Sequence, residues 1–274
     1  MDWRSSLEVF DLAAGRCRVV LRTPILIEAP NWHPDGSFLV NGEGKLWRAT
    51  TEGLSLIDTG FAEKCNNDHG FLPDGRIVFS AHSAQGSGIH VWDGHVVMTL
   101  PLPRPSWWHA AHGEQIAYAC ARGGDRHVRI ATAGADGQGE RVLTPEAAHH
   151  DGPDFSPCGT WIWFNSDATG HAQIWRMRRD GSEPAPVCRD ENVNWFPHPS
   201  PCGRHVLYLA YPPGTEGHPR DLDVSLWLMA PDGSGRRKLL DLFGGQGTIN
   251  VPCWSPDGGA FAFMRYAPEV NVRA

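Results

Sequence analysis

The stretch NWFPHPSPCGRHVLYLA, residues 194–210, places a proline-rich turn directly before an apolar run at 206–209. Serine and proline suit the first positions of a type I turn, and Gly203 suits its last position. The aromatic residues before the turn and the apolar run after it are typical of two paired, half-buried strands. The stretch therefore predicts an antiparallel hairpin.

The same pattern recurs along the whole chain. Its other copies are NWHPDG (31–36), GFLPDG (70–75), the degenerate WHAAHG (108–113), DFSPCG (154–159) and CWSPDG (253–258). The closing glycines of the six copies are 39, 38, 46, 44 and 55 residues apart, a period typical of propeller blades. Most copies are followed by a second strand pair around a glycine turn, as in IHVWDGHVVMTL (89–100). Four strands make one blade, and blades must stack around an axis because one twisted blade cannot bury its own faces.

The two ends of the chain complete each other. Residues 7–21 read as a second strand pair with no first pair before them, and residues 252–264 read as a first pair with no second pair after them. Joined, they form a sixth blade and remove the open edge of the ring. The prediction is an all-β, six-bladed β-propeller of four-stranded blades, a single domain over residues 1–274 whose last blade is closed by both termini.

The charge and hydropathy of the chain argue against two kinds of partner. The formal net charge is −7, with acidic and basic residues interspersed, so we expect no nucleic-acid partner. No stretch approaches 18 apolar residues, so we expect no membrane insertion.

The expected compartment is the cytoplasm. MDWRSSLEVF shows no basic segment followed by an apolar one, so no signal peptide is visible; a truncated N-terminus would leave the periplasm open. The seven cysteines are odd in number and include no CxxC pair, which favours a reducing setting.

Repeats such as VPCWSPDGGAFAF (251–263) resemble those of the TolB C-terminal propeller family. More distantly they are similar to the propellers of prolyl-oligopeptidase-type peptidases and of oligogalacturonate lyases. The resemblance covers nearly the whole chain and implies the same six-bladed fold. The TolB likeness implies protein partners, and the peptidase likeness implies a hydrolase domain whose G-x-S-x-G motif this sequence lacks. The lyase likeness implies manganese held by histidines and a glutamine; Gln246 matches the glutamine, while Ile249 and Val251 stand at histidine positions.

The two faces of the predicted propeller differ in composition. The P-D-G and D-G turns share one face, the turn face. The segments that lead into each blade share the other, the mouth face, with the loops between second and third strands; they are irregular and polar, as binding loops often are. Two residues before the usual proline, the six blades carry Glu28, Asn67, Pro105, Asp151, Trp195 and Asn250. This column should ring the mouth of the central channel, either as strand caps with channel water or as a ligand funnel.

The candidate ligand-binding residues of this funnel share the mouth face. They are Glu28, Asn67, Asp68, His69, Trp107, His150, Asp151, Asn194, Trp195, His198 and Asn250. Trp107, Trp108 and Trp195 could stack on sugar rings, whereas Trp32, Trp161, Trp163, Trp175, Trp227 and Trp254 should pack between blades.

Histidines are frequent on the mouth face. When the blades are aligned on their turns, the histidines on this face are His69, His82, His149, His150, His171, His198 and His218. A divalent metal needs three or four converging ligands, and His69, His150, Asp151 and His198 are the candidates, although no H-x-H or H-E-x-x-H spacing supports them. The irregular loop YPPGTEGHPRDLDV (211–224) carries Glu216, His218, Asp221 and Asp223 and is either a lid over the funnel or an inert insertion.

Three functional hypotheses follow. The first is a non-catalytic propeller without cofactor that binds a small polar ligand at the funnel. The second is an interaction scaffold for a protein partner, and the third is a lyase or hydrolase that uses one divalent metal ion on a saccharide or peptide. Binding and scaffolding are ranked above catalysis because no set of acid, base and nucleophile stands out.

Overall fold

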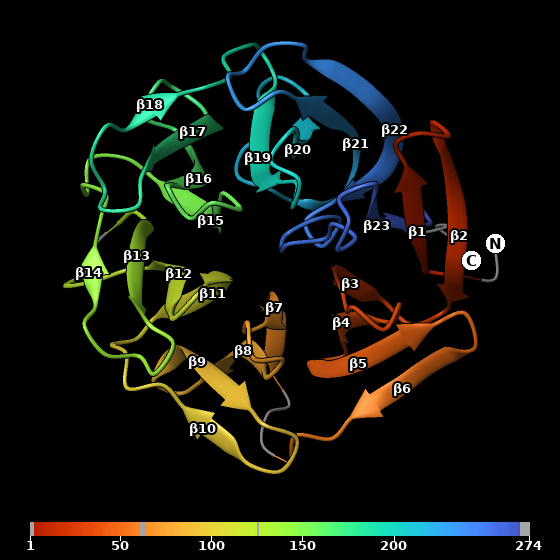
Figure 1. The fold of residues 1–274 in the computed structure, drawn as a ribbon, viewed down its shortest axis with the longest axis horizontal. Coiled ribbons are helices and arrows are strands. Elements are labelled where there is room, and N and C mark those ends of the chain that lie inside the picture. Colours follow the sequence, from red (N-terminus) through yellow and green to blue (C-terminus); the bar gives the residue numbers. More distant parts are fainter. Residues whose placement is uncertain (1–2, 61–63, 125, 269–274) are drawn as a thin grey trace, which may run out of the picture.

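Six sheets surround a common axis in the computed structural model, which describes residues 3–60, 64–124 and 126–268 (Figure 1). Five of the sheets are complete four-stranded blades formed by consecutive strands. Blade 1 contains β3 (Ile27–Trp32), β4 (Phe38–Gly42), β5 (Lys45–Thr50) and β6 (Gly53–Ile57). Blade 2 contains β7 (Cys65–Phe71), β8 (Ile77–Ser83), β9 (Gly86–Trp92) and β10 (Val97–Thr99). Blade 3 contains β11 (Ser106–His112), β12 (Gln115–Cys120), β13 (Arg129–Gly134) and β14 (Arg141–Val142).

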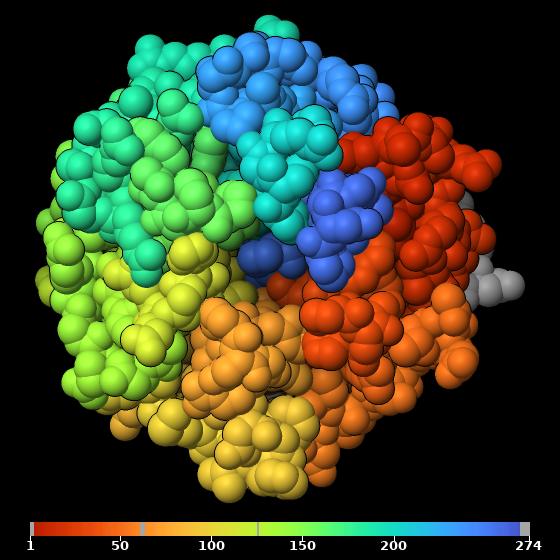
Figure 2. Space-filling view, viewed as in Figure 1, coloured from red at the N-terminus to blue at the C-terminus, as the bar shows by residue number. Residues whose placement is uncertain are grey.

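The remaining blades follow the same order around the ring. Blade 4 contains β15 (His150–Phe155), β16 (Trp161–Ser166), β17 (Gln173–Arg178) and β18 (Ala185–Pro186). Blade 5 contains β19 (Val193–Pro199), β20 (Val206–Tyr211), β21 (Arg220–Met229) and β22 (Arg237–Gly245). Blade 6 contains β1 (Ser5–Asp11), β2 (Arg16–Thr23) and β23 (Ala260–Tyr266). In the space-filling view the blades surround a central recess (Figure 2).

Blade 6 is closed by both ends of the chain, as predicted. The strand β1 lies between β2 and β23, with Ser5 opposite Tyr266 and Asp11 opposite Ala260. The innermost position is taken by the segment around Trp254, which forms a single bridge to Phe261. The six-bladed all-β fold predicted from the repeats is therefore confirmed.

The P-D-G turns form because an aspartate closes each one. Asp35, Asp74 and Asp257 accept hydrogen bonds from the backbone N–H two residues further on, at 2.9, 3.1 and 2.9 Å respectively. The glycine that follows takes a positive φ, 89° at Gly36, which costs a residue without Cβ little. These local contacts explain why the motif is so regular.

Blade 3 departs from the repeat. Its first two strands are joined by a two-residue connection, because His112 pairs with Gln115. This turn is shorter than the P-D-G turn, so aligning the blade on Gly113 was wrong. Pro105, which that alignment placed in the funnel column, precedes β11, and the blade instead presents His109 at the axis.

Apolar side chains fill the spaces between blades. One buried cluster joins Leu7, Val9 and Ala262 of blade 6 to Ile27 and Val40 of blade 1. Trp163 and Trp254 are buried, whereas Trp32, Trp161, Trp175 and Trp227 are partly buried and pack against such clusters or neighbouring rings. The structural placement predicted for these tryptophans is confirmed. Among the described residues, no helix has the length and apolar character needed to cross a membrane.

Leu7→Ala should lower the free energy of unfolding by about 2–5 kcal/mol, because Leu7 is fully buried where the two chain ends pair. Leu56→Ala is the matched control. Leu56 is 48% exposed on the outer strand of blade 1, so its loss should stay within about 0.5 kcal/mol. Urea unfolding of both variants measures the difference, and equal small losses would contradict the tight packing of blade 6.

Candidate functional site

The innermost strand of each of blades 1 to 5 contains a register shift at the same place. The shifts lie between Glu28 and Asn31, Cys65 and His69, Trp108 and Ala110, Asp151 and Asp154, and Trp195 and His198. In three of these shifts the residue that directly follows the last paired residue before the shift has a positive φ. These residues are Ala29, Gly152 and Phe196, with φ of 57°, 58° and 53°. A bulge re-aims the neighbouring side chains. Here it directs polar residues toward the axis on both sides of the shift.

His69 and His198 connect neighbouring blades inside the channel. The His69 ring lies 2.8 Å from Asn31 Oδ1 and 3.1 Å from Asn41 Oδ1. The His198 ring lies 2.8 Å from Asp154 Oδ2 and 2.6 Å from the Ile249 carbonyl oxygen. Burial lowers the pKa of His69 to about 3, so its imidazole is neutral. Both nitrogens of each ring face oxygen atoms of the protein, and the neutral His69 ring can donate to only one of its two.

Closer to the mouth, charged side chains gather around one carboxylate. Asp151 at the start of β15 lies 3.3 Å from His109 Nε2, 3.7 Å from His149 Nε2 and 3.8 Å from His218 Nε2. A second carboxylate, Asp68 of β7, lies 3.9 Å from the same His109 nitrogen. We call Asp68, His109, His149, Asp151 and His218 the mouth cluster. Its members come from three blades and from the loop before β21.

The mouth cluster shifts the pKa values of its own members. Burial by itself raises the pKa of Asp151, but His109 and His149 outweigh it and hold this pKa well below the ordinary range. Burial lowers the pKa of His109 and of His149, yet nearby carboxylates reverse the effect and raise both. The pKa of Asp68 is raised to about 6 by burial, with repulsion from Asp151 adding to it and His109 opposing it. Asp151 is thus an ionised anchor, and Asp68 can change charge near neutral pH.

The loop predicted as a lid or an insertion is shorter than expected, because β21 already begins at Arg220. Its His218 ring packs edge-on against Trp195 and Phe196, with centroids 4.4 and 5.3 Å apart. Asp221 pairs with Arg4 at 2.9 Å and with Arg220 at 3.1 Å. Burial lowers the pKa of His218, so this ring closes the side of the mouth in its neutral form.

Two pockets flank the mouth cluster. The blade 1–2 pocket, of about 300 Å³, is lined by Glu28, Asn67, Asp68, Arg220 and Gln246 among others. Arg220 Nη1 lies 3.6 Å from Glu28, whose pKa is raised by burial against the opposing effect of Arg220. The blade 4–5 pocket, of about 410 Å³, is lined by His149, Asn165, Asp167, Trp195, Glu216 and His218 among others.

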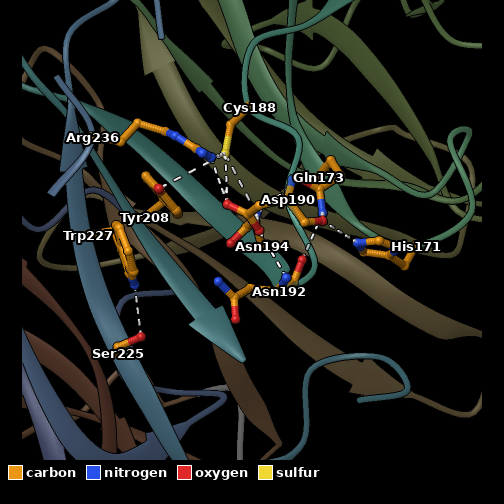
Figure 3. Close-up of polar contacts among 10 residues, drawn as sticks. All are labelled: His171, Gln173, Cys188, Asp190, Asn192, Asn194, Tyr208, Ser225, Trp227 and Arg236. Atoms are coloured by element: carbon orange, nitrogen blue, oxygen red, sulfur yellow. Dashed lines mark hydrogen bonds and ion pairs between the residues drawn. The ribbon is translucent and has the colours of Figure 1, made fainter. Parts of the chain in front are cut away.

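Other predicted funnel residues have mainly protein neighbours. Asn194 is fully buried in a network between blades 4 and 5, where its amide donates to Gln173 Oε1 at 3.0 Å and to Asp190 Oδ1 at 3.1 Å (Figure 3). Arg236 reaches the same aspartate at 2.6 Å, and its guanidinium also contacts Cys188 Sγ at 2.8 Å. Asn194 therefore lies in a polar link between blades.

Three more candidates are placed as follows. His150 is buried against the Phe164 ring, and burial lowers its pKa to about 4. Asn250 accepts a hydrogen bond from the Gly247 backbone N–H. Trp107 is half-buried in β11, opposite Ala119.

The candidate metal ligands lie in different parts of the structure. Asp151 belongs to the mouth cluster, while His69 and His198 lie in the interblade contacts described above. Within residues 3–60, 64–124 and 126–268, no group of three or more His, Cys, Asp or Glu side chains is arranged to hold a metal ion.

His109 is the residue that sequence reasoning missed. It was assigned to a degenerate turn copy, but the structure places it inside β11, between Asp68 and Asp151. Aligning blade 3 on its first strand, rather than on Gly113, would have put His109 next to the funnel column. His149 and His218 were recognised as mouth-face histidines, but only the fold brings them to one carboxylate.

The fold and this site together define a six-bladed β-propeller with a charged, histidine-rich mouth. No protein-family model matches the chain. An uncharacterized protein of Agrobacterium fabrum is 44% identical over 97% of this chain and 93% of its own length. A solved Agrobacterium tumefaciens structure named "putative TolB" is 44% identical, with a TM-score of 0.93 over 98% of this chain and all of that one.

At lower identity, TolB from Acinetobacter baumannii shares the fold, at 18% identity and a TM-score of 0.64 over 89% of this chain and 65% of that one. The chain belongs to the TolB-like family of six-bladed β-propellers. The resemblance inferred from the repeats is confirmed.

Asp68→Asn should stabilise the protein relative to the wild type more at pH 8 than at pH 4.5. The folded-state pKa of Asp68, about 6, lies above its unfolded value, so stability present at low pH is lost as the pH rises through about 6. Asparagine keeps the shape without that charge. The pH-dependent part of the gain should be about 1–3 kcal/mol, measured by urea unfolding at both pH values.

The control for this experiment is Asp74→Asn on the turn face. Its bond to Arg76 lowers the pKa of Asp74, so the stability that this ionised group contributes is lost only as the pH falls below its ordinary value of 3.8. The stability gap between this variant and the wild type should therefore be nearly the same at pH 4.5 and at pH 8. A stability gap of Asp68→Asn that is equal at both pH values would contradict the burial of the Asp68 charge.

Proposed function

We propose that this chain is a non-catalytic binding propeller that holds a small polar ligand at the mouth of its channel. The observation that carries the proposal is the largely buried Asp151 carboxylate, 14% exposed, approached by His109, His149 and His218. Burying charged groups costs free energy, which the pairing of Asp151 with His109 and His149 offsets. Concave sites with perturbed pKa values are where ligands most often bind.

The chemistry of the mouth supports a ligand with both donors and acceptors. The raised pKa values of His109 and His149 favour their N–H donors, and Asp151 and Asp68 supply acceptors. In the blade 1–2 pocket, Arg220 supplies donors and Glu28 supplies acceptors. Because neither charge sign dominates, a ligand of strong single charge is less suited than a polar one.

The position of the mouth supports binding as well. The turn face repeats one simple motif held by local hydrogen bonds, whereas the mouth face differs in every blade. Variation between blades on a rigid ring is the usual way in which such folds acquire specificity. The cytoplasm remains our prediction for where this binding takes place, on the basis of the cysteine pattern.

A thermal-shift screen tests the proposal. The probes are neutral sugars, uronic acids, amino acids, dipeptides and nucleosides at millimolar concentration. At least one should raise the Tm of the wild type, and Asp151→Asn should weaken its binding at least about tenfold, because the anchor for His109 and His149 loses its charge. Isothermal titration below the Tm of each variant separates affinity from stability.

His149→Gln, on a half-exposed side chain, provides a second variant with a smaller effect on folding. Asp257→Asn on the turn face is the control and should bind the same probe as the wild type does. The proposal is wrong if no probe binds the wild type, or if Asp151→Asn binds as tightly as Asp257→Asn. If the chain instead captures a protein partner, and only substitutions on the rim of the mouth abolish that capture, the scaffold hypothesis is favoured.

A further inference from the structure

The blade 4–5 pocket contains buried polar groups that the fold leaves unpaired. Among the described residues, Asn165 Nδ2 and Trp195 Nε1 have no hydrogen-bond partner. Both residues line this pocket, yet Asn165 is fully buried and Trp195 is 3% exposed. Buried donors in native proteins nearly always have an acceptor, and leaving one unpaired is costly. An oxygen from outside the chain, of a water or of a ligand, would satisfy the two N–H groups.

The orientation of Asn165 is set by the backbone. Its Oδ1 accepts a hydrogen bond from the Phe196 N–H at 3.3 Å, within the bulge of β19. The amide group cannot rotate without losing that bond, so Nδ2 stays the unpaired atom. Trp195 is held in turn by the His218 ring, 4.4 Å away. Both donors are thus preorganised.

Carboxylates, the Thr215 hydroxyl and histidines that include His149 and His218 are the other polar groups of the pocket. Asp167 and Glu216 line it, and Asp151 lies behind His218, 3.8 Å from its Nε2. The Asp167 carboxylate accepts a hydrogen bond from the backbone N–H of His149 at 2.8 Å, which fixes the carboxylate at the pocket wall. A ligand carboxylate would meet these three acidic groups, and a simple cation would leave the buried donors unpaired. A hydroxyl group suits both, because it accepts from an N–H and donates to a carboxylate.

We propose that the blade 4–5 pocket binds a neutral saccharide of one or two rings, with a ring hydroxyl oxygen accepting from Asn165 Nδ2 or Trp195 Nε1. The volume of about 410 Å³ lies within the usual range for small-molecule sites. The inference rests on the proposed function of the mouth and specifies the ligand class of one of its flanks. Glu216 on the rim selects against acidic sugars.

The test is isothermal titration at pH 7 with D-glucose, D-galactose, D-mannose, N-acetyl-D-glucosamine and maltose, beside D-glucuronate and D-galacturonate. At least one neutral sugar should bind with a millimolar or lower Kd. The uronate of glucose or galactose should bind at least about tenfold more weakly than its parent sugar, because of the acidic groups. Trp195→Phe keeps the aromatic ring, removes only the N–H and should weaken the neutral sugar about fivefold to tenfold.

Trp108→Phe is the matched control. Trp108 is 1% exposed and its Nε1 is also unpaired among the described residues, but it does not line the pocket. This variant should keep the wild-type affinity within about twofold. Glu216→Gln is a second test that does not depend on whether Trp195→Phe folds, because the Glu216 side chain is exposed. This variant should reduce the ratio of affinities between the neutral sugar and its uronate.

The outcomes separate this inference from the proposed function. Binding of an amino acid, dipeptide or nucleoside that depends on Asp151, with no neutral sugar bound, overturns the saccharide inference and leaves the proposed function standing. Tighter binding of a uronate, or equal effects of Trp195→Phe and Trp108→Phe, also overturns it. Binding of no probe by the wild type overturns both.

Discussion

Polar side chains that point toward the axis of a closed ring must find partners on neighbouring blades, because one blade cannot supply them. Asn31 meets this requirement by donating to the Pro252 carbonyl and lying against His69. On the opposite side His198 joins Asp154 to the Ile249 carbonyl. Each contact spans two blades, and leaving such a group unpaired would cost about 1–3 kcal/mol. The inner strands therefore hold the ring in register, while apolar side chains fill the space between blades.

The same requirement produces the candidate site. At the mouth the pairing groups are charged, so Asp68, His109 and Asp151 continue the contacts around the axis through blades 2, 3 and 4. The bulges that turn these residues inward also set the positions of Trp195 and Asn165. There, among the described residues, the Asn165 and Trp195 N–H donors have no acceptor. Unpaired buried donors beside a pocket are the feature on which the proposed binding site rests.

Sequence reasoning recovered the repeat, the number of blades, the closure by both termini and the packing of the strand tryptophans. It failed at the turn of blade 3 and at the orientation of Asn194. Blade 3 uses a two-residue connection in place of the P-D-G turn, so the alignment selected Pro105 and missed His109. Asn194 stood in the right segment, but its amide is directed into the contacts between blades 4 and 5. One residue of displacement along a strand moves a side chain to the other face.

By itself the sequence determined the blades, because turn chemistry and the alternation of apolar residues act within about ten residues of chain. Which polar residues meet was decided only by the tertiary structure. His109, Asp151 and His218 are far apart in sequence, and they approach one another because closure of the ring brings three blades to one axis. Their pKa values follow from that proximity and from burial, neither of which a single blade possesses. The charges at the mouth are therefore a property of the closed ring.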